Sequence, residues 1–205
     1  MNAAHPDTAV THATFNQTIC MTPQPVSNAI HAIDAVVHRS LCGLAADSFI
    51  HGWYAKEHNW VSYFVFRHLL QECAPDGVLW DPAQIGIEVN VPQPPGYPRP
   101  TVCRDIVIWP EAGMTCWKTE WSPAAHPLAI IEWKTHRGSR RNRRVKHERA
   151  WLRAYCNWQP SVVGYAVAID VGESDVQLTC TRYCGDKESK WFSQSCTTPS
   201  PVIAR

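Results

Sequence analysis

The chain has 205 residues, a length that suits one domain with its own hydrophobic core. Only 18% of the residues are charged, 45% are hydrophobic and the net charge is +1, which excludes a disordered chain. No apolar run approaches the ~20 residues of a membrane-spanning helix. The segment Met1–Gln17 lacks the basic and apolar regions of a secretory signal, and nine cysteines without a CxxC pair indicate reduced thiols. We therefore expect a cytoplasmic protein with no membrane partner.

The chain begins with a polar segment and two predicted helices. Residues 1–26 are polar and predict a loosely ordered N-terminal arm. Apolar residues at helical spacing follow Ser27, a residue type that caps helices, and predict a helix over 28–45. A second helix is expected over 53–73, ended by the turn residues at 75–77.

Strands dominate the rest of the chain. Alternating apolar residues predict strands over 85–91 and 102–109, and the link over 110–127 contains alternating Thr and Trp residues typical of a short extra strand. The apolar segment 128–134 predicts a central strand. A helix near 143–156 and strands over 162–169 and 176–183 follow. The sequence thus predicts an α/β domain over 27–184, with a mixed sheet of four to five strands flanked by helices, and an irregular tail over 185–205.

Basic residues are concentrated in one segment. Residues 137–153 hold eight of the nineteen Lys and Arg residues and a single acid, Glu148. Such a concentration in a nearly neutral chain indicates contact with a polyanion, most often a nucleic acid. The residues expected to contact its phosphates are Arg137, Arg140, Arg141, Arg143, Arg144 and Lys146.

Three charged residues stand in segments that are otherwise apolar. Glu132 and Lys134 share one face of the predicted central strand, because side chains alternate along a strand. Asp105 interrupts the apolar strand over 102–109 and would lie beside Glu132 if the two strands are neighbours. Paired carboxylates repel each other unless a divalent cation lies between them, and oxygen ligands suit Mg²⁺ or Mn²⁺.

Glu57 is a further candidate for this site. It lies on the apolar stripe of the predicted helix over 53–73, four residues before Val61, so its carboxylate would point at the sheet. An alternative is that Glu57 only stabilises the N-terminal end of its helix.

Together these residues resemble the PD-(D/E)xK nuclease superfamily, which has the restriction-endonuclease-like fold. The matching elements are the helix with Glu57, the strand with Arg104-Asp105, the strand with Glu132-Trp133-Lys134 and the basic helix after it. The resemblance covers roughly residues 50–183. Arg104 replaces the proline of the motif, and Trp151 and Tyr155 have the WxxxY spacing where the exonuclease branch carries Gln and Tyr.

The resemblance implies a Mg²⁺-dependent deoxyribonuclease, with Mn²⁺ as a substitute ion. Asp105, Glu132 and the carbonyl of Trp133 would ligate the metal, Glu57 would assist through water or a second ion, and Lys134 would orient the attacking water. Cutting both strands of a duplex would favour a homodimer.

Two other functions remain open at the level of sequence. The same fold and basic helix would also suit a non-catalytic nucleic-acid-binding module. The cysteines at 180, 184 and 196 would instead suit a zinc-stabilised interaction domain. The sequence does not distinguish duplex, branched or single-stranded DNA from RNA as the substrate.

Overall fold

A computed structural model describes residues 26–51, 56–119, 122–137, 143–172 and 175–197 of the chain. These residues form a mixed α/β structure with one sheet of six strands, a two-stranded hairpin and three α-helices. Residues 1–25 of the predicted arm and residues 198–205 of the predicted tail lie outside the described residues.

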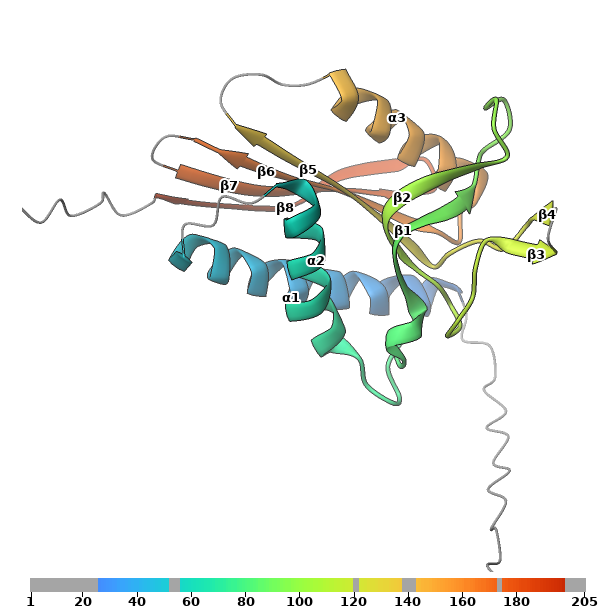
Figure 1. Cartoon of the computed structure of the whole chain (residues 1–205), viewed down its shortest axis with the longest axis horizontal. Helices are drawn as coiled ribbons and strands as arrows, with labels where there is room; N and C mark the ends of the chain where they lie inside the picture. Colours follow the sequence, from blue (N-terminus) through green and yellow to red (C-terminus); the bar gives the residue numbers. More distant parts are fainter. Residues whose placement is uncertain (1–25, 52–55, 120–121, 138–142, 173–174, 198–205) are drawn as a thin grey trace, which may run out of the picture.

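The large sheet has the order β1-β2-β5-β6-β7-β8 (Figure 1). Its strands are β1 (Ile85–Pro92), β2 (Thr101–Ile108), β5 (Ala129–Arg137), β6 (Val163–Val171), β7 (Asp175–Cys184) and β8 (Lys187–Thr197). Only the β5–β6 pair is parallel, and the other neighbours are antiparallel. The predicted central position of the strand with Glu132 and Lys134 is therefore confirmed, since β5 lies between β2 and β6.

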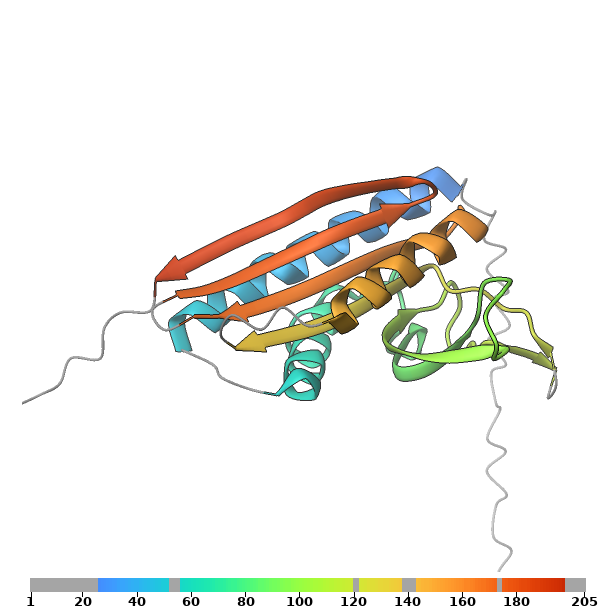
Figure 2. The same ribbon diagram turned by 90° about the horizontal axis from the view of Figure 1, so that it is seen from above.

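Helices cover both faces of this sheet. Figures 1 and 2 show α1 (Val26–His51) and α2 (Glu57–Arg67) on one face and α3 (Arg143–Trp158) on the other. The second helix is shorter than predicted, because it ends at Arg67 and continues as a 3₁₀ turn, Leu69–Glu72. A second 3₁₀ turn, Pro82–Gln84, precedes β1. The link after β2 contains the small hairpin of β3 (Trp117–Thr119) and β4 (Ser122–Pro123).

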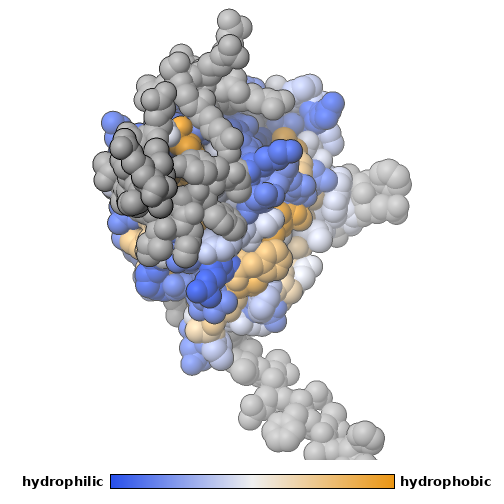
Figure 3. Space-filling model, turned by 60° about the vertical axis from the view of Figure 1, so that its left-hand side comes forward, coloured by the Kyte–Doolittle hydropathy of each residue, from blue (hydrophilic) through white to orange (hydrophobic). Residues whose placement is uncertain are grey.

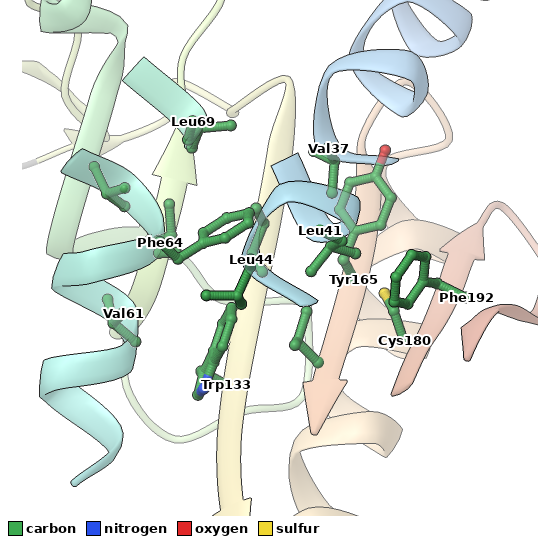
Figure 4. Close-up of a cluster of buried hydrophobic side chains, with 14 of the residues drawn as sticks. Val37, Leu41, Leu44, Val61, Phe64, Leu69, Trp133, Tyr165, Cys180 and Phe192 are labelled. Atoms are coloured by element: carbon green, nitrogen blue, oxygen red, sulfur yellow. The ribbon is translucent and has the colours of Figure 1, made fainter. Parts of the chain in front are cut away.

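The apolar face between α1, α2 and the sheet forms the larger core. Figure 4 shows the side chains of both helices directed at β5, β6 and β7, and the ring centroids of Phe64 and Trp133 are 5.3 Å apart. A partly buried ion pair joins α1 to the sheet within this layer. Arg182 donates to both carboxylate oxygens of Asp34, at 2.6 and 2.8 Å, and the Tyr165 hydroxyl donates to the same carboxylate.

The opposite face forms a second core beneath α3. Trp151, Leu152, Tyr155 and Cys156 of that helix pack on apolar residues of β2, β5 and β6. Ile130 belongs to this core, whereas Ile131 and Trp133 belong to the core under α1 and α2. Alternation along β5 therefore places Glu132 and Lys134 on one face, as the sequence predicted, and this face is the one toward α3.

The irregular tail predicted after residue 184 is wrong, because residues 187–197 form the strand β8. β7 and β8 are joined by the two-residue turn Gly185-Asp186, with Gly185 at φ = +56°. Gly-Asp is a favoured pair for such a turn. The strand is polar because it lies at the sheet edge, where only Phe192 among its described side chains is buried. The predicted count of four to five strands is thereby corrected to six.

The first two strands change faces halfway along their length. Ile85 and Ile87 pack against the α1–α2 core, but Val89 and Val91 pack against the α3 core. Glu88, between them, has φ = +52°, the only positive φ of a non-glycine residue in the described part of the chain. A Cβ atom on Gly86 would come within 2.6 Å of the Val89 side chain, so glycine is needed next to the point where the strand changes faces. The regular alternation predicted over 85–91 is therefore interrupted at Glu88.

Few large apolar side chains are exposed among the described residues. Figure 3 shows one face with a narrow apolar band between hydrophilic areas, and the large apolar side chains exposed in the described residues are Phe66, Trp80 and Trp117. No helix in these residues combines the length and apolar character needed to cross a membrane.

Glu88→Gly is expected to stabilise the protein. A side chain at positive φ costs about 1–3 kcal/mol, and glycine relieves this cost while adding unfolded-state entropy, so we expect a net gain of about 1 kcal/mol. Asn90→Gly in the same strand is the control, and it is expected to lose about 0.5–1 kcal/mol. Urea unfolding measures both changes, and a destabilised Glu88→Gly would show that the ion pair of Glu88 outweighs its backbone strain.

Candidate active site

The candidate site lies where β2 and β5 diverge. The two strands pair only over Ile106–Ile108 and Ala129–Ile131. Beyond this point the amide of Trp133 has no partner in β2, and it donates instead to the Asp105 carboxylate at 2.7 Å. The Asp105 side chain thus takes the place of the backbone acceptor in a neighbouring strand, and the buried Trp133 amide is not left without a hydrogen bond. Asp105 is fixed beside the Glu132-Trp133-Lys134 segment by this bond.

The ammonium group of Lys134 lies at the centre of the opening. Its Nζ is 2.8 Å from Oε1 of Glu57, 3.2 Å from Oε1 of Glu148 and 3.9 Å from Oδ2 of Asp105. It also donates to the carbonyl oxygen of Trp133 at 2.6 Å. Glu57 begins α2 on one face of the sheet and Glu148 belongs to α3 on the other. The opening therefore brings side chains from both helical layers to one lysine.

Glu148 is the site residue that sequence analysis missed. It was noted only as the single acid of the basic segment. Its Oε1 pairs with Lys134, whereas its Oε2 is buried and has no hydrogen-bond partner among the described residues. The signal in the sequence was spacing: Glu148 precedes Trp151 by three residues and Leu152 by four, so all three lie on one face of the helix. A helix that packs over the central strand turns this face toward Lys134.

Glu132 is held from the other side by Arg104. The Arg104 guanidinium donates to Oε1 of Glu132 at 3.0 Å and stacks on Trp151, 3.5 Å from the ring centroid. Both charged side chains are more than nine-tenths buried. Trp151 is fixed in turn by donating its Nε1–H to Gln93 at 3.1 Å. Arg104 thus supplies the counter-charge for Glu132.

Burial shifts the pKa values of the acids in this site. It raises the pKa of Glu132 to about 8, against the opposing charge of Arg104, and it raises the pKa values of Asp105 and Glu148 above the usual range. Burial alone would lower the pKa of Lys134, but its hydrogen bond to Glu57 and the charges of Asp105 and Glu148 raise that pKa instead. The site therefore holds an ammonium ion among acids that are costly to ionise.

The oxygen-rich composition of the site fits a hard divalent cation. Four carboxyl groups surround Lys134 and Arg104, which leaves two negative charges in excess when all are ionised. The buried Oε2 of Glu148 has no hydrogen-bond partner among the described residues, and a divalent cation would supply one. However, no three His, Cys, Asp or Glu side chains in the described residues are arranged to hold a metal ion by themselves. The Lys134 ammonium occupies the space between the oxygen atoms.

The cysteines do not form a zinc site in the described residues. Cys180 and Cys184 stand four residues apart on β7, which separates them by about 13 Å along the strand. A tetrahedral zinc ion needs ligands at about 2.3 Å. The side chain of Cys196 lies outside the described residues.

The predicted phosphate-binding segment is only partly described. The side chains of Arg137, Arg140, Arg141, Arg143, Arg144 and Lys146 all lie outside the described residues. The backbone places Arg137 at the end of β5, three residues beyond Lys134, and it places Arg143 at the start of α3. Trp117, in the link where a short extra strand was predicted, pairs with Pro123 in the small hairpin and is 42% exposed.

Comparison of the chain with protein-family models, curated proteins and solved structures found no match.

The acid cluster predicts an unusual dependence of stability on pH. The raised pKa values of Asp105, Glu132 and Glu148 mean that the folded protein binds protons that the unfolded chain has released. The free energy of unfolding should therefore fall as the pH rises from about 5 to 8, by about 2 kcal/mol or more in chelator. Lys134, whose pKa is raised from 10.5, contributes nothing in this window.

Glu132→Gln should flatten this fall, because glutamine keeps the shape of the side chain and does not titrate. Glu111→Gln, at an exposed position, is the matched control and should leave the curve unchanged. Urea unfolding at a series of pH values measures the effect. Burial lowers the pKa values of His68 and His126, which opposes the fall in both proteins over the lower part of this window. The test is therefore the difference between the two proteins, and a Glu132→Gln curve parallel to that of wild type would contradict the burial of Glu132.

Proposed function

We propose that this protein is a metal-dependent nuclease that hydrolyses phosphodiester bonds of DNA. The main observation is the set of contacts around Lys134, where three carboxylates from β2, α2 and α3 enclose one ammonium group. A binding module has no use for an acid cluster beside its basic segment, since carboxylates repel phosphates. A nuclease needs this arrangement, because hydrolysis requires positive charge and an oriented water next to the phosphate.

The order of the elements supports the same proposal. Helix α2 carries Glu57, β2 carries Asp105, and β5 carries Glu132 and Lys134, followed by α3 and the parallel strand β6. This is the order expected from the resemblance to the PD-(D/E)xK superfamily. We therefore assign the restriction-endonuclease-like fold as part of the proposal, with β7 and β8 as additional strands.

Mg²⁺ or Mn²⁺ would be held by Asp105, Glu132 and the Trp133 carbonyl, with Glu57 and Glu148 at its margin. Such an ion supplies positive charge next to the phosphate and makes a nearby water more acidic. This assignment is supported by the bonds that fix both carboxylates: the Trp133 amide donates to Asp105, and Arg104 donates to Glu132.

Lys134 would orient the attacking water and stabilise charge on the phosphate. Its ammonium has three hydrogens, and the contacts with Glu57, Glu148 and the Trp133 carbonyl hold them within the opening. Its raised pKa keeps the group protonated at neutral pH. The group is therefore a fixed positive charge beside the scissile phosphate.

The basic segment would bind the neighbouring phosphates. Its backbone begins at the end of β5 and continues into the first turn of α3, one turn before Glu148. Contacts of this kind position the nucleic-acid backbone without selecting a sequence.

The direct test is cleavage by the purified protein. Circular and linear duplex DNA, single-stranded DNA and RNA are incubated with Mg²⁺, with Mn²⁺ and with chelator. We expect metal-dependent cleavage of DNA that falls at least about 10³-fold in Asp105→Asn and in Lys134→Met, in line with loss of a preorganised charge at a transition state. Lys190→Met, on the exposed edge strand, should cleave normally. DNA binding without cleavage under any metal would support the non-catalytic module instead.

Cation binding separates the roles of the lysine and the acids. Removing the ammonium that lies between the oxygen atoms should tighten Mn²⁺ binding to Lys134→Met by at least about tenfold, because like charges about 4 Å apart repel by several kcal/mol at a partly buried site. Asp105→Asn and Glu148→Gln should weaken binding. Isothermal titration calorimetry measures all three without any need for activity. Equal affinity of Lys134→Met and wild type would mean that the cation binds elsewhere.

A further inference from the structure

A hollow beside the candidate active site has no role in the proposed chemistry. It has a volume of about 340 Å³ and is lined by His58, Val61, Ser62, Ile87 and Glu88. The first three residues belong to α2 and the last two to β1. The hollow therefore lies between α2, the helix that carries Glu57, and β1, one of the two edge strands of the sheet.

Two neighbour relations place the hollow next to the site. His58 follows Glu57 directly in α2. Glu88 stands opposite Asp105, because the β1–β2 register pairs Ile87 with Ile106 and Val89 with Arg104. Each wall of the hollow thus contains a residue adjacent to one of the proposed catalytic acids.

The conformation of Glu88 indicates that its side chain is needed here. The residue has φ = +52°, and glycine would adopt the same backbone conformation, and so the same change of faces, without strain. Its Oε1 lies 2.6 Å from Nδ1 of His58, but both side chains are more than half exposed, and exposed pairs of this kind contribute little to stability. Neither the strand pairing nor the ion pair explains a glutamate at this position, whereas ligand binding does.

The lining suits a flat ring with a hydrogen-bonding edge. Val61 is almost fully buried and Ile87 is half-buried, so they give the hollow an apolar side. His58, Ser62 and Glu88 add a polar side, and imidazole rings stack on bases. With a nucleic-acid backbone at the adjoining site, a ligand of this shape is a nucleobase.

The carboxylate selects among bases. An ionised glutamate only accepts hydrogen bonds, and it pairs with the exocyclic amino group of cytosine. Adenine and guanine also carry an exocyclic amino group, whereas thymine carries none. The ring of a base can enter the hollow only when the base is unpaired and unstacked.

We propose that the hollow binds one unpaired, amino-bearing nucleobase next to the scissile phosphate. This inference rests on the proposed function and adds a preference for single-stranded or locally opened DNA, cut beside cytosine, adenine or guanine.

The first test maps the cut positions in single-stranded DNA of randomised sequence. Wild type should cut next to cytosine, adenine or guanine about tenfold more often than next to thymine, as one specific base contact allows. Glu88→Gln should reduce this preference to less than about threefold, because the amide can also donate to thymine. Glu111→Gln should keep it. Cleavage without base preference, or an unchanged preference in Glu88→Gln, would overturn the inference and leave the nuclease proposal intact.

A second test measures binding without cleavage. The affinities of short oligo(dC) and oligo(dT) are compared in chelator by fluorescence anisotropy. Wild type should bind oligo(dC) more tightly, and Glu88→Gln should bind both equally. This result in a protein that never cleaves DNA would keep the hollow and reject the nuclease. Equal affinity of wild type for both oligonucleotides would reject the hollow as a base-binding site.

Discussion

The separation of β2 from β5 at Asp105 determines the rest of this structure. A continuous sheet would keep side chains of the two helical layers apart, because α2 and α3 cover opposite faces. Where the two strands diverge, the Trp133 amide loses its strand partner and takes the Asp105 carboxylate instead. Glu57 from one layer and Glu148 from the other then both reach Lys134. One missing stretch of strand pairing thus creates the opening, positions the aspartate and admits both glutamates.

The electrostatics of this opening oppose the stability of the fold. Burial raises the pKa values of Asp105, Glu132 and Glu148, and only Arg104 and Lys134 compensate within the described cluster. Apolar residues of similar volume would serve a stable core better. Arg104 offsets part of the cost for Glu132, and its stacking on Trp151 fixes its position. Such a cluster is consistent with selection for charge chemistry at the expense of stability, as at many functional sites.

Particular residues show what sequence could and could not predict. Glu57, Asp105, Glu132 and Lys134 stood out because charged residues in apolar elements are costly unless paired, and the structure brings them into one region. Glu148 was hidden because its basic neighbours made it look like part of a solvated helix. Strand β8 was missed because an edge strand needs few apolar residues, although Gly185-Asp186 marked its turn. The change of faces at Glu88 could not be predicted from the sequence, because the apolar residues keep the same spacing of two on both sides of it and the positive φ depends on tertiary packing.

The change of faces at Glu88 links the acid cluster around Lys134 to the hollow between α2 and β1. Glu88 and Asp105 are opposite each other, and both strands change faces at this level: Arg104 lies on the α3 side, whereas Ile106 packs in the α1–α2 core. Regular alternation would place Arg104 on the same face as Ile106, away from Glu132 and Trp151. The change of face therefore provides the counter-charge for Glu132 at one side of the sheet. At the other side it leaves the Glu88 carboxylate against α2, at the edge of the hollow. The acid cluster and the hollow are thus two results of one backbone feature, which accounts for their lying side by side.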